Sequence, residues 1–145
     1  MAWIRMCGEA TKPKAYIYNQ GTWSVPYENP GAYRWAGNIP VGFTLQADKM
    51  TAPGTTGIKM VGTTNMIDVT PYTELHIRAK VTAGSPQCVI ATAKENSGVL
   101  AMEVMSDVGV EKEYVLNVAL LNTSGYIFFI CSNNIGIEVY ELWLT

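Results

Sequence analysis

The chain has 145 residues, of which 48 % are hydrophobic and only 15 % are charged, and its formal net charge is -2. This length fits one domain with a sizeable core, and a largely apolar chain with so few charges is not intrinsically disordered. Its basic residues are scattered singly and no apolar run approaches the roughly 20 residues that cross a bilayer, so we expect neither nucleic-acid binding nor membrane insertion.

Residues 1–14 form the first predicted unit, an N-terminal arm ahead of the first clear strand. The arm begins with Trp3, Ile4 and Met6, apolar side chains for which the core of a single domain has little use at that distance. We therefore expect these three residues to take part in assembly with another copy or another protein. The opening residues show no apolar segment and no cleavage site of a secretory signal, so we expect no secretion.

An aromatic loop follows at residues 22–38, a stretch rich in Pro, Gly and Asn. Rigid aromatic side chains stack on sugar rings while neighbouring polar groups bind the hydroxyls, and the same residues also suit a protein–protein hot spot. A third alternative is that the aromatic rings fold back and close the open end of the fold. The candidate residues for binding a glycan or a partner are Trp23, Tyr27, Tyr33, Arg34 and Trp35.

Downstream of the loop, apolar and polar residues alternate with period two, which is typical of half-buried strands. The pattern predicts strands at residues 73–82, 99–105 and 113–120, and a further alternating segment at residues 41–47. The side chains expected to face inward are Val41, Phe43, Leu45 and Ala47; Leu75, Ile77, Ala79 and Val81; Leu100, Met102 and Val104; and Tyr114, Leu116, Val118 and Leu120.

Three other segments have a different pattern. Residues 88–93 and 126–131 are apolar on both alternating faces, which predicts central strands buried on both sides. In residues 135–144 the apolar phase shifts after Val139, which predicts either a β-bulge or a strand covered on both sides.

Turn residues separate these segments at intervals of about eight to twelve positions, and no window shows capped helical periodicity. The chain is therefore predicted to be all-β. The expected architecture is a β-sandwich of jelly-roll type with eight to ten antiparallel strands, in a single domain over residues 15–145.

The residues that enzymes use are sparse. The only histidine, His76, alternates with charged residues on an outward strand face, so we interpret it as an exposed surface residue. The three aspartates are far apart, and no nucleotide-binding, metalloprotease or hydrolase motif is present. We expect no catalytic residue, no metal and no cofactor, although two carboxylates brought together by the fold would leave hydrolysis open. Three cysteines without a CxxC pair are expected to be reduced and mostly buried: Cys7, Cys88 and Cys131.

Three segments carry a resemblance to a known group of proteins. AYIYNQGTW (residues 15–23) is a strand followed by a glycine turn, and MIDVTPYTELHIRAKV (residues 66–81) has an Asp-x-Thr-x-Tyr turn before a strand. SGYIFFICSNNIGIEVYELWL (residues 124–144) contains two strands and a tryptophan. In this pattern, over the opening strand and about the last 80 residues, the chain resembles the jelly-roll, carbohydrate-binding-module-like domains encoded among phage and prophage tail, baseplate and head-decoration genes.

The resemblance implies a structural or accessory protein of a phage virion, assembled in the bacterial cytoplasm and located in the virion. Its partners would be other virion proteins, further copies of itself in a homo-oligomer, and a cell-surface glycan. The alternative is a stand-alone carbohydrate-binding module for a host polysaccharide, and a glycan-degrading enzyme is the third hypothesis. The resemblance also implies binding aromatics on loops or on a concave sheet, and it extends here only to Trp23, Tyr27, Tyr33 and Trp35. Because the chain lacks the acidic loop of calcium-dependent modules, no bound metal is expected.

Overall fold

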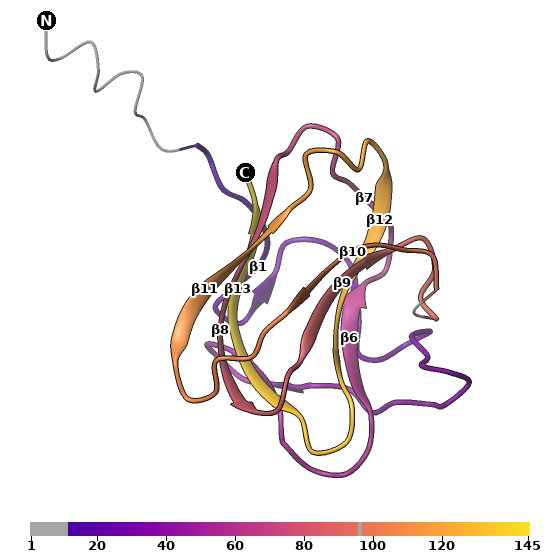
Figure 1. Cartoon of the computed structure of the whole chain (residues 1–145), viewed down its shortest axis with the longest axis vertical. Coiled ribbons are helices and arrows are strands. Elements are labelled where there is room, and N and C mark those ends of the chain that lie inside the picture. The colour runs from indigo at the N-terminus through magenta and orange to yellow at the C-terminus, as the bar shows by residue number, and fades with distance from the viewer. Residues whose placement is uncertain (1–11, 96) are drawn as a thin grey trace, which may run out of the picture.

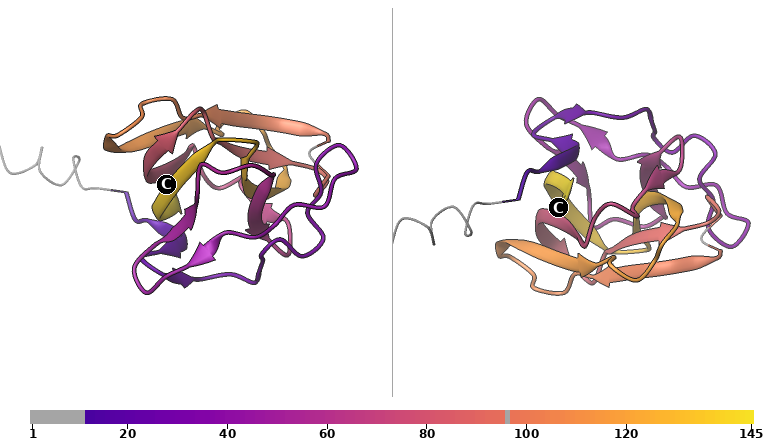
Figure 2. Two further views of the ribbon diagram at one scale, coloured as in Figure 1. Left: turned by 90° about the horizontal axis from the view of Figure 1, so that it is seen from below. Right: turned by 90° about the horizontal axis from the view of Figure 1, so that it is seen from above.

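The computed structural model describes residues 12–95 and 97–145 and is a sandwich of two antiparallel β-sheets (Figure 1). The described residues contain no helix, and hence no helix that could cross a membrane. The prediction of an all-β sandwich is confirmed. Seen along the long axis, the N-terminal strands (indigo to purple) lie on the side opposite β10 (Val99–Val104) and β11 (Glu111–Asn117), which are orange (Figure 2).

Seven strands form sheet A. Its main path runs in the order β11, β8 (Glu74–Ala83), β13 (Gly136–Leu144), β1 (Ala15–Asn19) and β2 (Thr22–Trp23). Beside this path, β5 (Met50–Ala52) pairs with β13, and β4 (Thr44–Leu45) pairs with β5. Strand β8 therefore lies between β11 and β13, at the centre of the long strands.

Six strands form sheet B. Its main path runs in the order β10, β9 (Gln87–Ala91), β12 (Ser124–Cys131), β6 (Lys59–Thr63) and β3 (Tyr27–Glu28), and β7 (Ile67–Asp68) pairs with β12. The described residues form thirteen strands, more than the expected eight to ten, because five of them are only two or three residues long.

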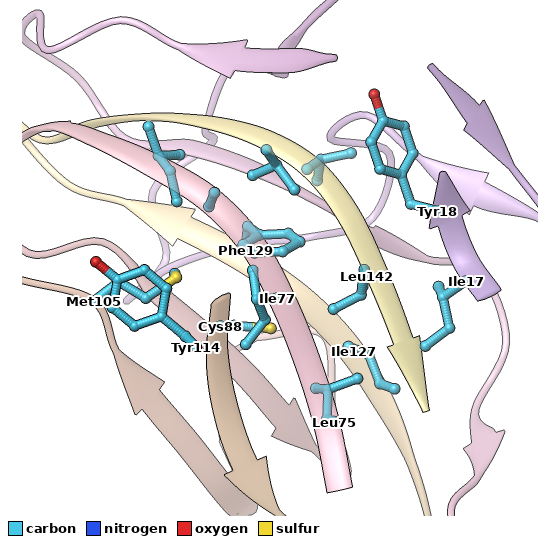
Figure 3. Packing of buried hydrophobic residues seen from close by; sticks show 14 of the residues in the cluster. Ile17, Tyr18, Leu75, Ile77, Cys88, Met105, Tyr114, Ile127, Phe129 and Leu142 are labelled. Carbon is cyan, nitrogen blue, oxygen red and sulfur yellow. The ribbon is translucent and has the colours of Figure 1, made fainter. Parts of the chain in front are cut away.

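The core lies between the two sheets (Figure 3). The inward side chains of β8 are fully buried, as the alternation predicts, and Ile77 and Leu142 of sheet A face Ile127 and Phe129 of sheet B. The predicted central strands are also confirmed, since β9 and β12 each have a neighbour on both sides in sheet B.

The phase shift in the last strand is a β-bulge. Val139 pairs with Ala79 and Glu141 pairs with Arg78, so Tyr140 is the extra residue between two consecutive pairs. The bulge lets β13 keep apolar side chains toward the core on both sides of the shift.

Two inward assignments in β10 are wrong. Met102 and Val104 are 43 % and 45 % exposed, because the pairing of β10 with β9 shifts between Val99 and Ala101 and reverses the alternation. Met105 is buried in their place. The sequence does not show this shift, because apolar residues occupy both phases of the strand.

The segments 41–47 and 113–120 also differ from expectation. Only Phe43 of the first is buried; its backbone is bonded by the Asn29 side chain, and only the two-residue strand β4 forms there. The outward residues of that segment are Val41, Leu45 and Ala47. The second ends as a strand at Asn117, whose side chain accepts a hydrogen bond from the Ala119 N–H, so Leu120 lies in a turn and is 90 % exposed.

The predicted arm falls mostly outside the described residues. Trp3, Ile4, Met6 and Cys7 lie in residues 1–11, whereas residues 12–14 lead directly into β1. Cys88 and Cys131 are free and buried, as expected for structural thiols.

Candidate functional site

The aromatic loop separates into two groups. The rings of Trp23 and Tyr27 stack with their centroids 4.9 Å apart and an interplanar angle of 8°, and Trp23 also contacts Tyr18. Trp23 is half-buried against the core, and Tyr27 is 41 % exposed. This pair joins the short edge strands β2 and β3, one from each sheet.

Tyr33 packs on the outer face of sheet B, where it is fully buried against Phe128. Its hydroxyl donates a 2.7 Å hydrogen bond to the Thr63 carbonyl, and burial raises its pKa above the ordinary range. The ring lies so close to Gly62 that a Cβ there would be 2.6 Å from its Cζ atom, so a residue without a side chain is required. Tyr33 thus plugs a sheet face and presents no surface to a ligand.

Arg34 and Trp35 belong to the same covering segment. The Arg34 guanidinium donates to the carbonyls of Gly31 and Tyr33, which holds the loop in place. Trp35 is half-buried and packs in the same apolar cluster. The structure therefore separates the predicted site residues between two locations, and binding through Trp23, Tyr27, Arg34 or Trp35 stays a prediction.

A row of ring-bearing side chains crosses the outer face of sheet A, the side of the sheet turned away from the core. The strand register places His76 beside Trp143 and Trp143 beside Tyr16. The rings of His76 and Trp143 stack at 5.0 Å and 4°, and Tyr16 meets Trp143 at 6.1 Å and 51°.

Trp143 forms the centre of this row but is only 3 % exposed. His76 and Tyr16 flank its ring, and the Lys14 Nζ lies 4.3 Å from the ring centroid. Trp143 therefore orients its neighbours, while the half-buried Tyr16 presents the accessible aromatic surface.

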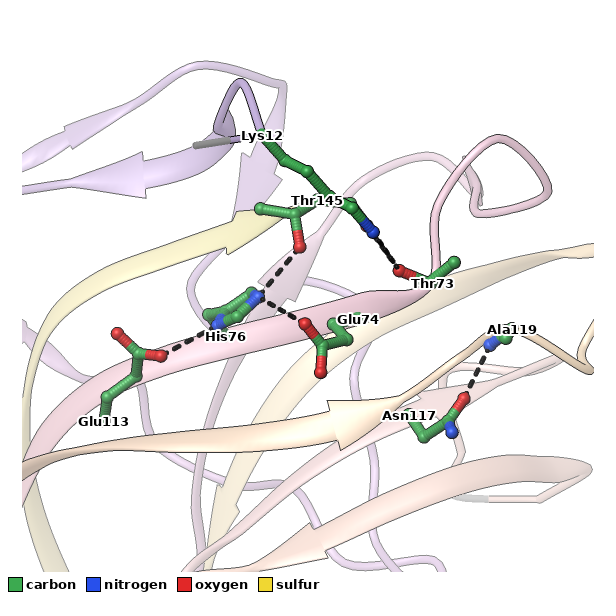
Figure 4. A network of polar contacts seen from close by, with 8 residues as sticks. All are labelled: Lys12, Thr73, Glu74, His76, Glu113, Asn117, Ala119 and Thr145. Atoms are coloured by element: carbon green, nitrogen blue, oxygen red, sulfur yellow. Dashed lines mark hydrogen bonds and ion pairs between the residues drawn. The ribbon is translucent and has the colours of Figure 1, made fainter. Parts of the chain in front are cut away.

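His76 is half-buried rather than exposed, which corrects the sequence interpretation (Figure 4). Its Nδ1 lies 2.9 Å from a Glu113 carboxylate oxygen, and its Nε2 lies 2.9 Å from the Thr145 hydroxyl and 3.4 Å from Glu74. The outward orientation of the His76 side chain was correctly predicted. Its neighbours on β11 and β13 could not be predicted, because they depend on which strands pair with β8.

Hydrogen-bonded polar pairs lie near this row on the outer face. Arg78 contacts Glu111 at 2.6 Å, and the Tyr16 hydroxyl donates to Glu141 at 3.1 Å. Such pairs present both hydrogen-bond donors and acceptors to a ligand that lies across them.

The bulge residue Tyr140 lies near the middle of β13 and contacts groups that lead toward the other end of the face. Its hydroxyl donates a 2.6 Å hydrogen bond to Glu138, which also pairs with Lys49 at 3.5 Å. The hydrogen bond from Tyr140 lowers the pKa of the Glu138 carboxyl, which therefore stays ionised at neutral pH.

A hollow lies at each end of the outer face. One of about 260 Å³ is bounded by Trp143, His76 and Lys14, and one of about 270 Å³ is bounded by Lys49, Thr51 and Glu138. Tyr16 lies beside the first hollow and Tyr140 lies near the middle of β13, with charged hydrogen-bonding groups beside both. This arrangement suits an extended polyhydroxylated ligand.

The described residues show little that supports covalent or metal chemistry. In that part of the chain, no three His, Cys, Asp or Glu side chains are placed to hold a metal ion. Burial raises the pKa of Cys131 to about 12 and that of Cys88 still further, so both thiols are protonated at neutral pH.

No protein-family model matches the chain, and no curated protein matches its sequence. Solved structures do resemble its fold. A mutant of a family 29 carbohydrate-binding module has a TM-score of 0.61 and 15 % identity, over 94 % of this chain and 92 % of that one. Another mutant from that family, in complex with cellulohexaose, has a TM-score of 0.62 and 14 % identity, over 91 % of this chain and 89 % of that one.

The family 11 carbohydrate-binding module of the cellulosomal cellulase Lic26A-Cel5E of Clostridium thermocellum has a TM-score of 0.59 and 12 % identity, over 93 % of this chain and 95 % of that one. At such low identity these similarities establish the fold alone. They confirm the carbohydrate-binding-module-like architecture expected from the sequence, and nothing in them indicates a phage origin.

Proposed function

We propose that this chain is a non-catalytic glycan-binding module that binds a sugar chain across the outer face of sheet A. The observation that carries the proposal is the combination of two half-buried tyrosines on that face, Tyr16 near one end and Tyr140 near the middle of β13, with charged hydrogen-bonding groups beside them. Sugar rings stack on aromatic faces, and their hydroxyls both donate and accept hydrogen bonds.

The fold supports this proposal. Carbohydrate-binding modules of families 29 and 11 have the same architecture, and one family 29 structure contains cellulohexaose. Of the hypotheses from the sequence, the stand-alone carbohydrate-binding module for a host polysaccharide therefore has the better support. A virion role, a virion location and virion partners stay predictions that rest on the sequence resemblance.

The two outer faces of the sandwich also differ in a way that favours sheet A. On sheet B, the segment with Tyr33 and Trp35 covers the apolar cluster around Phe128 and Ile130. On sheet A, the corresponding surface carries ion pairs and tyrosine hydroxyls that a ligand can reach. We therefore propose that the sugar binds to sheet A. A substitution in the aromatic loop serves as the control for substitutions on sheet A.

The test is calorimetric titration of the chain with oligosaccharides, starting with cellohexaose and mannohexaose and then a wider panel. Tyr16→Ala and Tyr140→Ala should each weaken the binding of any ligand found by about tenfold, which corresponds to about 1.4 kcal/mol for one lost aromatic stack. Tyr27→Ala, the same change on an exposed loop tyrosine, should leave the affinity within about twofold.

Circular dichroism spectra and melting curves serve to show that each variant is folded. Loss of binding in Tyr27→Ala alone would assign the ligand to the aromatic loop instead. Absence of binding across neutral and acidic oligosaccharides would refute the proposed function.

A further inference from the structure

A further hollow lies just beyond the row of rings, and residues 12–14 form one of its walls. Its volume is about 380 Å³, within the range of about 300–1,000 Å³ that small-molecule sites occupy. Lys12, Lys14 and Thr145 line both this hollow and the neighbouring one beside Trp143. A sugar chain on the outer face of sheet A therefore reaches these lysines at one end.

The two lysines have no carboxylate partner in the described part of the chain. Among these residues no carboxylate lies within 4.0 Å of Lys12 or Lys14. In contrast, four other cations each have an acidic partner: Lys49, Arg78, Lys94 and Lys112.

Neutral groups hold both ammonium groups in place. The Lys12 Nζ donates a 3.3 Å hydrogen bond to the Thr73 hydroxyl (Figure 4), and the Lys14 Nζ lies over the rings of Trp143 and Tyr16 at 4.3 and 5.8 Å. Both ammonium groups thus lie beside the hollow, with no carboxylate side chain of the described residues within 4.0 Å.

The remaining wall of the hollow carries no Asp or Glu side chain. Pro13, Pro71 and Tyr72 provide apolar surface on which a sugar ring can lie, and Thr73 and Thr145 provide hydroxyls. Two cations beside an apolar wall match a ring that carries an anionic substituent.

We infer that this hollow binds an acidic sugar residue, with its carboxylate placed between Lys12 and Lys14. The inference rests on the proposed function and adds the chemical class of the ligand, a glycan that contains uronic acid. The carboxylate would form charge-assisted hydrogen bonds with the two ammonium groups, while the rest of the chain crosses the outer face of sheet A.

The test compares a neutral oligosaccharide that ends in one galacturonate residue with its methyl ester, which keeps the sugar backbone and removes the charge. Binding to the acid should be about tenfold tighter than to the ester, and this ratio should fall as salt is raised from about 20 to 500 mM. Lys12→Met and Lys14→Met should each bring the ratio close to one. Lys112→Met, which removes a positive charge on β11, a strand that does not line the hollow, should leave it unchanged.

Several outcomes would overturn the inference. Equal binding of the acid and the ester would refute it while leaving the proposed function intact, and so would binding of neutral oligosaccharides alone. A preference for a sulfated oligosaccharide over the galacturonate would refute the carboxylate assignment.

Discussion

Glu28 and Lys94 form an ion pair that ties the aromatic loop to the connection between β9 and β10. Glu28 also accepts a 2.6 Å hydrogen bond from the Ala32 N–H, and Lys94 lies over the rings of Tyr33 and Tyr126. Burial alone would raise the pKa of Glu28, but the bonds from Lys94 and Ala32 outweigh it and lower the pKa. The ionised Glu28 carboxylate therefore stabilises the loop segment with Tyr33 that covers the outer face of sheet B.

Because of this ion pair, we expect the free energy of unfolding to fall as the solution becomes acidic. Because the folded pKa of Glu28 lies below its unfolded value of about 4.3, its contribution is present above that value and is lost as the pH falls through the folded pKa. Glu28→Gln should therefore lower the free energy of unfolding at pH 7, and the difference from the parent chain should shrink below about pH 4. Urea melts between pH 7 and pH 3 measure this, and a constant difference over that range would contradict it.

At the scale of single residues, the sequence predicts whether a side chain points toward or away from the core. It is less able to predict which other side chains lie beside it. The alternation in β8 places His76 outward, which the structure confirms. It cannot show that Trp143 and Glu113 lie beside it, because those contacts depend on which strands pair with β8. The row of aromatic side chains on the outer face was not predicted, because it also depends on which strands pair. The alternation in β1 and β13 is sufficient only to place Tyr16 and Trp143 outward.

Strand β8 is the main packing element of sheet A, since it pairs with both β11 and β13 over most of its length. Its side chain Ile77 is fully buried in the core between the sheets. Ile77→Ala should therefore reduce the free energy of unfolding by about 2–5 kcal/mol, the range for truncating a buried aliphatic side chain. Chemical denaturation with a tryptophan fluorescence signal measures the loss.

Leu120→Ala is the matched control for that truncation. Leu120 is 90 % exposed in the turn after β11, so its removal should change stability by no more than about 0.5 kcal/mol. Similar losses in the two variants would mean that the turn after β11 packs differently from this structure.

At the scale of strands, some shifts of register can be predicted and others cannot. The bulge at Tyr140 shows in the sequence because the apolar residues change phase across it. The shift in β10 does not, because Leu100, Met102 and Val104 stay apolar in one phase while Ala101 and Met105 offer apolar side chains in the other. Where both phases are apolar, the partner strand decides which one is buried.

At the scale of the whole molecule, the charged residues are few but unevenly distributed. Seven of the 22 charged residues point outward from three adjacent strands of sheet A: Glu74, Arg78, Lys80, Glu111, Glu113, Glu138 and Glu141. The molecule therefore has one strongly polar face, although only 15 % of its residues are charged. Assembly through Trp3, Ile4 and Met6 stays a prediction, since those residues lie outside the described part of the chain.

The account's central claim is that a glycan lies across the outer face of sheet A. The most direct measurement is a two-dimensional ¹H–¹⁵N NMR titration of the labelled chain with the oligosaccharide that binds best. The largest shifts should fall on the outward positions of β1, β8 and β13, including Tyr16, His76 and Tyr140, and on Lys14 beside them. Shifts confined to residues 22–38, with those strands unchanged, would contradict the claim.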